Sequence, residues 1–259
     1  DIIFIHQDYI KAGAEFIIAN NYAVTQPILK RADMLDQLED LTLKSLEIAK
    51  EAIQESGRDI LLAASLPPLE TSYRSDLILD SISMDSMYRE LASILENNVD
   101  IIICETMSHS AEARSALAAI QNSNSQKWLG WTLYGNQNTL PSGETITEAF
   151  NAVSDLKCDA YLINCGGVNL ITEGIRELRS LTDKRIGGYG NSEKIEISKE
   201  DRSDRPEEDH WSSATTITER EYAKETQIWV EEGATIVAGC CRTRPSHIKI
   251  LAETFQENN

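Results

Sequence analysis

The chain has 259 residues, 41% hydrophobic and 25% charged, which is the composition of an ordinary globular enzyme and a length sufficient for one large α/β domain. Its 24 Lys and Arg residues against 42 Asp and Glu residues give a formal charge of −18, which repels the phosphate backbone of nucleic acids and excludes them as expected partners. No apolar run approaches the roughly 20 residues that cross a bilayer, so a membrane span is excluded as well.

Short runs rich in Ile, Val and Leu recur along the chain, and most are apolar throughout, as in strands that are covered on both faces. The predicted strands are residues 15–20, 60–65, 100–105, 128–133, 159–164, 185–189 and 234–239. Amphipathic stretches with helical spacing precede, separate and follow these runs. The predicted helices are residues 1–12, 34–55, 84–96, 111–121, 145–156, 170–181, 218–231 and 245–255.

This alternation predicts a parallel sheet joined by crossover helices. An open doubly wound sheet could also hold seven strands, but it usually carries a glycine-rich phosphate turn after its first strand, and none occurs here. We therefore predict a (β/α)8 TIM barrel, formed by residues 1–259 as a single domain, whose first strand is expected upstream of Asp1. The charged segment 192–213, acidic on balance and poor in aliphatic residues, is predicted to be a mobile loop after the seventh barrel strand.

The chain contains five cysteines, an odd number, and no secretory leader, which indicates a reducing compartment and favours the cytoplasm. Cys104 and Cys158 are expected to be buried as small hydrophobic residues. Cys165 and the pair Cys240 and Cys241 instead follow two predicted strands directly, at the ends where barrel enzymes carry their active sites.

Three thiolates that converge on one barrel mouth could hold a Zn²⁺ ion and leave its fourth tetrahedral position open for a substrate thiol. The open position suits thiol chemistry, because a free thiol has a pKa of about 8.5 and zinc stabilises the reactive thiolate at neutral pH. Gly239, just before the cysteine pair, is expected to give the turn the backbone freedom that it needs. Spacing alone leaves open the alternative that these three thiols are also structural.

The segment 237–248 contains Gly239, Cys240 and Cys241 followed by Thr, Pro and His-Ile, and it resembles the Gly-Cys-Cys stretch of the homocysteine S-methyltransferase family. The dipeptide Asn164-Cys165 resembles the Asn-Cys strand end of the same family, and further similarities run nearly end to end. The resemblance implies a zinc-dependent (β/α)8 barrel. It also implies transfer of a methyl group from a sulfonium donor, S-methylmethionine or S-adenosylmethionine, to homocysteine or a similar thiol, giving methionine.

The resemblance also implies roles for individual residues. The implied zinc ligands are Cys165, Cys240 and Cys241. Glu105 would be a pocket carboxylate that accepts the ammonium group of the amino-acid substrate, a role that suits a carboxylate at the end of an apolar strand. The implied polar positions of the substrate pocket are Asn20, Asn164 and Asn191. Asn at strand ends is also common turn chemistry, so this alternative stays open.

Other functions remain open at this stage. The Asp-Gly-Gly-type glycines of the family's opening strand have no counterpart here, which motivates a degenerate or non-catalytic zinc-binding barrel as an alternative. A betaine-type methyl donor is another, and a redox barrel that uses Cys240 and Cys241 as a vicinal dithiol is a third. His109 and His247 are expected at helix starts or on the surface rather than as metal ligands.

Overall fold

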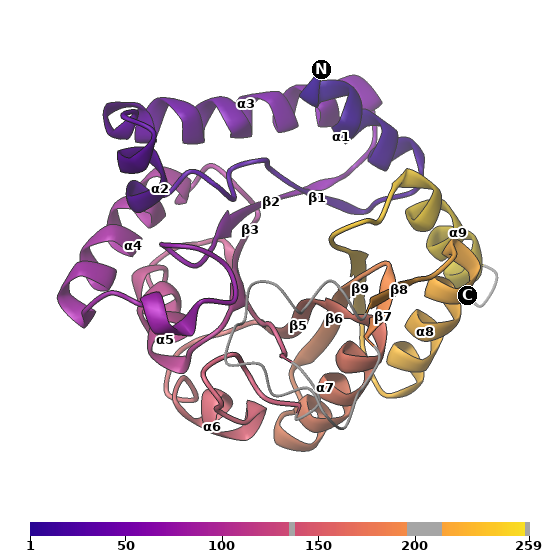
Figure 1. Ribbon diagram of the computed structural model, residues 1–259. Helices are drawn as coiled ribbons and strands as arrows, with labels where there is room; N and C mark the ends of the chain where they lie inside the picture. The colour runs from indigo at the N-terminus through magenta and orange to yellow at the C-terminus, as the bar shows by residue number, and fades with distance from the viewer. Residues whose placement is uncertain (135–137, 196–213, 257–259) are drawn as a thin grey trace.

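The chain folds around one curled parallel sheet, which the computed structural model shows in Figure 1 and describes for residues 1–134, 138–195 and 214–256. Its strands are β1 (Phe16–Ile18), β2 (Leu61–Leu66), β3 (Ile101–Met107), β4 (Gln126–Trp131), β5 (Ala160–Gly167), β6 (Arg185–Asn191) and β9 (Ile236–Gly239). They are hydrogen-bonded in the order β1-β2-β3-β4-β5-β6-β9. Each of the seven predicted strands overlaps one of them, so the α/β barrel-type fold is confirmed, with seven strands of the described residues in this sheet.

Helices cover the outside of this sheet, as Figure 1 shows. They are α1 (Ile2–Lys11), α2 (Gln26–Arg31), α3 (Leu38–Ser56), α4 (Ser81–Leu95), α5 (Ser110–Ala119), α6 (Ile146–Asn151), α7 (Val168–Leu181), α8 (Glu219–Glu231) and α9 (Pro245–Gln256). The sequence did not predict the short helix α2, which begins beside a proline in its first turn. Helix α3 ends where Gly57 adopts a φ of +63°, a conformation that costs glycine little. Within the described ranges, no helix has both the length and the apolar character that a membrane span requires.

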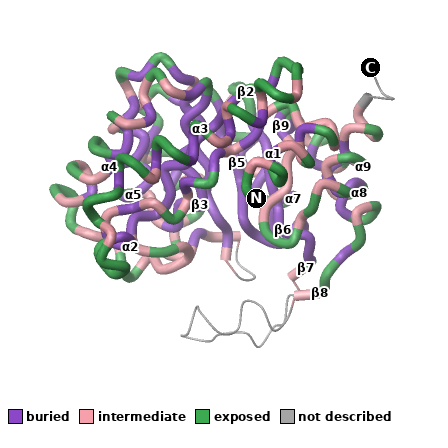
Figure 2. Tube along the Cα trace, turned by 90° about the horizontal axis from the view of Figure 1, so that it is seen from above, coloured by how far each residue is buried: buried purple, intermediate pink, exposed green. Residues whose placement is uncertain are grey.

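The core has two layers because side chains alternate between the faces of each strand. On β3, Ile102 and Cys104 pack outward against the helices, whereas Ile101 and Ile103 belong to the cluster inside the barrel. The same alternation sends Glu105 inward, and Figure 2 shows buried residues concentrated along the strands. Cys104 and Cys158 are buried in the outer layer, which confirms their prediction as small core residues.

The structure differs from the loop predicted for residues 192–213. Residues Glu193–Ile195 form β7, which pairs antiparallel with β8 (Ala214–Thr216) in a separate two-stranded sheet. Three-residue strands are held mainly by backbone hydrogen bonds, so their amino-acid composition does not reveal them in the sequence. Residues 196–213, the rest of the predicted mobile loop, lie outside the described residues.

Candidate metal centre and active site

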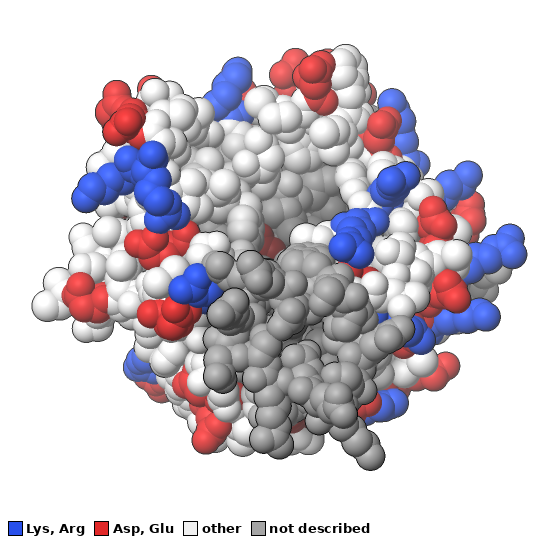
Figure 3. All heavy atoms as spheres, viewed as in Figure 1, with Lys and Arg blue, Asp and Glu red and all other residues white. Residues whose placement is uncertain are grey.

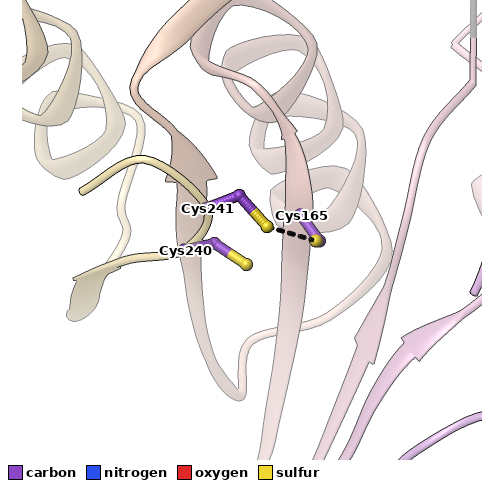
Figure 4. A group of neighbouring side chains, drawn as sticks. All are labelled: Cys165, Cys240 and Cys241. Carbon is purple, nitrogen blue, oxygen red and sulfur yellow. Dashed lines mark hydrogen bonds between the residues drawn. The ribbon is translucent and has the colours of Figure 1, made fainter. Parts of the chain in front are cut away.

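Three cysteine side chains from distant parts of the chain meet at the ends of two strands (Figure 4). The Sγ of Cys165 lies 3.9 Å from the Sγ of Cys241, and the sulfurs of Cys165, Cys240 and Cys241 all lie within 4.8 Å of one another. A tetrahedral ion with Zn–S bonds of about 2.3 Å separates its sulfur ligands by about 3.8 Å. The side chains therefore fit a common ion with only small adjustments, although β6 lies between their strands.

Cys165 stands at an irregular point of β5. The register with β6 shifts between Asn164 and Gly167, and Cys165 has a φ of +58°, which is uncommon for any residue but glycine. The Tyr73 hydroxyl lies 2.8 Å from the Cys165 sulfur and 2.9 Å from its carbonyl oxygen. With 8% of its surface exposed, Cys165 is the most deeply buried of the three thiols, and its strained backbone is held by partners from other elements.

The turn after β9 presents the other two cysteines. The Cys240 N–H donates to the carbonyl of Gly190, and the Cys241 N–H donates to Oδ1 of Asn191 at 3.1 Å. The backbone freedom of this turn was predicted to come from Gly239. The residue with a left-handed backbone conformation is instead Arg242, with a φ of +63°. Gly239 is needed for space instead, because a Cβ there would lie 2.4 Å from the hydroxyl of Thr243.

The clustering makes the three thiols titrate together. Hydrogen bonds with Cys165 and Cys241, together with burial, raise the pKa of the Cys240 thiol well above its ordinary value. Hydrogen bonds from Cys165 and Cys240 lower the pKa of Cys241 to about 3, and the charge of Arg242 acts in the same direction. The cluster thus favours a single thiolate, and a cation that binds all three sulfurs must displace the remaining thiol protons.

Glu105 is a buried carboxylate inside the barrel, with 5% of its surface exposed. The hydroxyl of Ser65 donates to Oε1 and the hydroxyl of Tyr189 donates to Oε2 at 2.7 Å. Burial raises the pKa of Glu105, and the nearby charge of Cys241 raises it further. This position suits the pocket carboxylate implied by the sequence, whose contact with a substrate stays a prediction.

The three asparagines implied as pocket residues occupy different environments. Asn20 is exposed at the end of β1, whereas its neighbour Asn21 is buried and bonds both the N–H and the carbonyl of Ser65. Asn191 accepts from the Cys241 backbone and donates to the buried Glu193 at 3.1 Å. The resemblance pointed to Asn20, and the amide that lies buried against Ser65 is that of the adjacent Asn21.

Asn164 connects two strand ends across β4. Its Oδ1 accepts from the Thr106 N–H at 3.0 Å and its Nδ2 donates to the Thr106 hydroxyl at 2.8 Å. To reach Thr106, the Asn164 side chain passes over Gly130 of β4. A Cβ at Gly130 would lie 2.7 Å from Asn164 Oδ1, so the absence of a side chain there makes room for the amide. Asn164 thereby holds the backbone beside Glu105 and Cys165. Direct contact of Asn20, Asn164 or Asn191 with a substrate stays a prediction.

A hollow lies in the middle of the face seen in Figure 3, with acidic and basic side chains spread around its outer rim rather than gathered in one patch. Two of the four histidines, His109 and His247, were expected at helix starts or on the surface, and both lie outside the cysteine cluster. His109 caps α5 through Nδ1, and His247, in the first turn of α9, accepts through Nδ1 from the N–H of Arg244, which directly precedes that helix. Within the described parts of the chain, no His, Asp or Glu joins the three sulfurs as a further ligand group.

Known proteins resemble this chain over nearly its whole length. The family model described as homocysteine S-methyltransferase matches residues 2–255. Homocysteine S-methyltransferase 1 of Brassica oleracea var. italica is 28% identical over 278 residues, which cover 97% of this chain and 82% of that protein. The selenocysteine Se-methyltransferase of the same plant is 28% identical over 275 residues, which cover 95% and 77%.

Solved structures support the same assignment of the fold. The metallated form of the homocysteine methyltransferase MmuM from Escherichia coli matches with a TM-score of 0.81 at 22% identity, covering 98% of this chain and 84% of that one. Its oxidized form matches with a TM-score of 0.78 over the same shares of the two chains. Together with the family match over residues 2–255, the curled sheet and the cysteine cluster show that this chain belongs to the homocysteine S-methyltransferase family.

Proposed function

We propose that this protein transfers a methyl group from a sulfonium donor, S-methylmethionine or S-adenosylmethionine, to the thiol of homocysteine, giving methionine. Zn²⁺ would be held by Cys165, Cys240 and Cys241. The observation that carries the proposal is the gathering of these three sulfurs within 4.8 Å of one another. The family match supports homocysteine as acceptor, and the metallated form of MmuM supports a metal at such a site.

The donor set argues for zinc among the common divalent ions. Thiolates are soft ligands that select zinc over magnesium or calcium, and three of them leave one tetrahedral position for a substrate sulfur. When bound there, the metal would keep the substrate as a nucleophilic thiolate at neutral pH.

The residues of the chain would supply binding and orientation. Glu105, held by Ser65 and Tyr189, would accept the ammonium group of homocysteine and turn its thiol toward the sulfur cluster. The formal charge of −18 attracts cationic sulfonium donors. In the transfer itself, the C–S bond of the donor breaks as the new C–S bond forms in line, so positioning accounts for much of the acceleration.

Metal analysis combined with a donor screen tests this proposal. Purified protein would be assayed for bound metal and for methyl transfer from isotopically labelled S-methylmethionine, S-adenosylmethionine and betaine. Homocysteine and selenocysteine would serve as acceptors, the latter because a selenocysteine Se-methyltransferase is among the relatives. We expect about one zinc per chain. Cys165→Ala should lose both metal and turnover, whereas the matched control Cys158→Ala, which removes a thiol outside the cluster, should keep the metal.

The outcomes separate the alternatives. Zinc without turnover from any donor would favour a non-catalytic zinc-binding barrel, and turnover with betaine alone would replace the sulfonium donor. Protein that binds no zinc while its cysteines are reduced would refute the proposal. Activity that survives Cys165→Ser would point to Cys240 and Cys241 acting as a vicinal dithiol.

A further inference from the structure

We propose that Tyr73 is a selectivity residue: its hydroxyl hydrogen-bonds the sulfur of Cys165 and thereby keeps Cys165 a metal ligand rather than a methyl acceptor. The inference rests on the proposed function, because it presupposes metal-bound thiolates beside a methyl donor. It concerns which of several similar sulfurs receives the methyl group.

The chemistry of the proposed site creates this need. Cys165 and the substrate would both present thiolate sulfurs to the same ion, within reach of one sulfonium group. Methylation of Cys165 would break the donor C–S bond and form a bond from the methyl carbon to Sγ. The donor cation and the thiolate anion would become two neutral thioethers, so no further reactant is required. Since a thioether is a weaker zinc ligand than a thiolate, this side reaction would disable the site.

The Tyr73 hydroxyl is placed to oppose that side reaction. It lies 2.8 Å from the Cys165 sulfur and 2.9 Å from the carbonyl oxygen of the same residue. An ionised sulfur is the stronger acceptor, because charge-assisted hydrogen bonds are roughly twice as strong as neutral ones. The hydroxyl proton therefore turns to the thiolate when Cys165 is deprotonated. A hydrogen bond of this kind withdraws charge from the sulfur and lowers its nucleophilicity.

The backbone around Tyr73 supports a role beyond packing. Tyr73 has a φ of +65°, a left-handed conformation that bulky residues rarely adopt and that is held only where surrounding structure demands it. It lies in the irregular segment between β2 and α4, yet its hydroxyl reaches a residue 92 positions further along the chain. Tyr73 also lines a small pocket together with Cys165, Asn191 and Glu193, where restricted water access strengthens hydrogen bonds.

Tyr73→Phe isolates the hydroxyl, because the ring and the backbone conformation are unchanged. The matched control is Tyr9→Phe. The Tyr9 hydroxyl donates to the carbonyl of Thr243 at 3.1 Å, in the turn that follows Cys240 and Cys241. Both variants therefore remove a phenol hydroxyl that contacts a backbone carbonyl near the cluster, but only the Tyr73 hydroxyl also contacts a sulfur.

The experiment uses the full zinc-loaded chain without homocysteine. Each protein is incubated with S-methylmethionine or S-adenosylmethionine, and separately with iodoacetamide, and modification of Cys165 is followed by peptide mass spectrometry. Zinc affinity is measured by competition with a chromogenic chelator. We expect Tyr73→Phe to modify Cys165 about tenfold faster than wild type with either reagent class, and to bind zinc about 10-fold more weakly, in the range typical of lost outer-shell partners. Tyr9→Phe should match wild type in Cys165 reactivity.

Parallel turnover assays separate the two proposals. Normal wild-type turnover with equal Cys165 reactivity in Tyr73→Phe and wild type would overturn the role of Tyr73 and leave the proposed function intact. Faster iodoacetamide modification in Tyr73→Phe, without methyl transfer from any donor, would uphold the hydrogen bond as a control on the sulfur and refute methyl-transfer selectivity together with the proposed function. Absence of zinc from the wild-type chain would overturn both.

Discussion

Replacing Asn164 by Ala should loosen the two strand ends that carry Glu105 and Cys165. Asn164 is fully buried, and its amide bonds both the N–H and the hydroxyl of Thr106. Thr106 and Cys165 have φ angles of +59° and +58°, so both strands leave regular geometry at the points that this side chain joins. Strained backbone of this kind persists only while its surroundings hold it in place.

The expected loss of stability follows from these contacts. Each of the two hydrogen bonds contributes about 0.5–1.5 kcal/mol net, and a buried N–H left without a partner carries a desolvation penalty of about 1–3 kcal/mol. The lost hydrogen bond to the Thr106 N–H and the desolvation penalty of that N–H are partly the same loss, so the two contributions do not add in full. Asn164→Ala should therefore lower the free energy of unfolding by about 2–4 kcal/mol.

Urea denaturation followed by tryptophan fluorescence measures this change. The control is Asn98→Ala, which removes a half-buried amide that donates to the Ile94 carbonyl at 2.9 Å, away from the site. The control should lose about 1 kcal/mol or less. A loss for Asn164→Ala below about 1 kcal/mol, or no larger than that of Asn98→Ala, would refute the idea that Asn164 ties the strand ends together.

Three further predictions concern packing, capping and pH. Gly188→Ala places a Cβ 2.4 Å from Cγ2 of Ile171 and should destabilise the chain by about 1–3 kcal/mol; an unchanged melting temperature would contradict this. Thr218→Ala removes the capping box of α8 and should lower the free energy of unfolding by about 1 kcal/mol in urea titrations; an unchanged midpoint would argue against the cap. Burial raises the pKa of Glu105 in the folded state above its unfolded value of about 4.3, so the stability that the protonated acid contributes is present at low pH and is lost as the pH rises through the folded pKa. In metal-free protein, the stability difference between wild type and Glu105→Gln should therefore shift in favour of the variant from acidic to neutral pH, and a difference that stays constant would contradict the raised pKa.

The amino-acid sequence by itself was sufficient to locate the strands, most of the helices and the candidate metal ligands. Apolar runs and amphipathic periods are local properties of a chain, so all seven strands of the curled sheet could be located before its geometry was known. Cys165, Cys240 and Cys241 could be singled out because they directly follow two of those runs. Cys104 could be set aside because it directly follows the apolar run of residues 101–103, and Cys158 because it lies at the end of a predicted helix.

Only the tertiary structure decided which side chains meet. Glu105 is held by Ser65 and Tyr189, which lie 40 and 84 positions away, and Tyr73 reaches Cys165 across 92 positions. Such contacts depend on the register and curl of the whole sheet, which no local pattern encodes. For the same reason, only the structure shows that Asn21 is buried while the adjacent Asn20 is exposed.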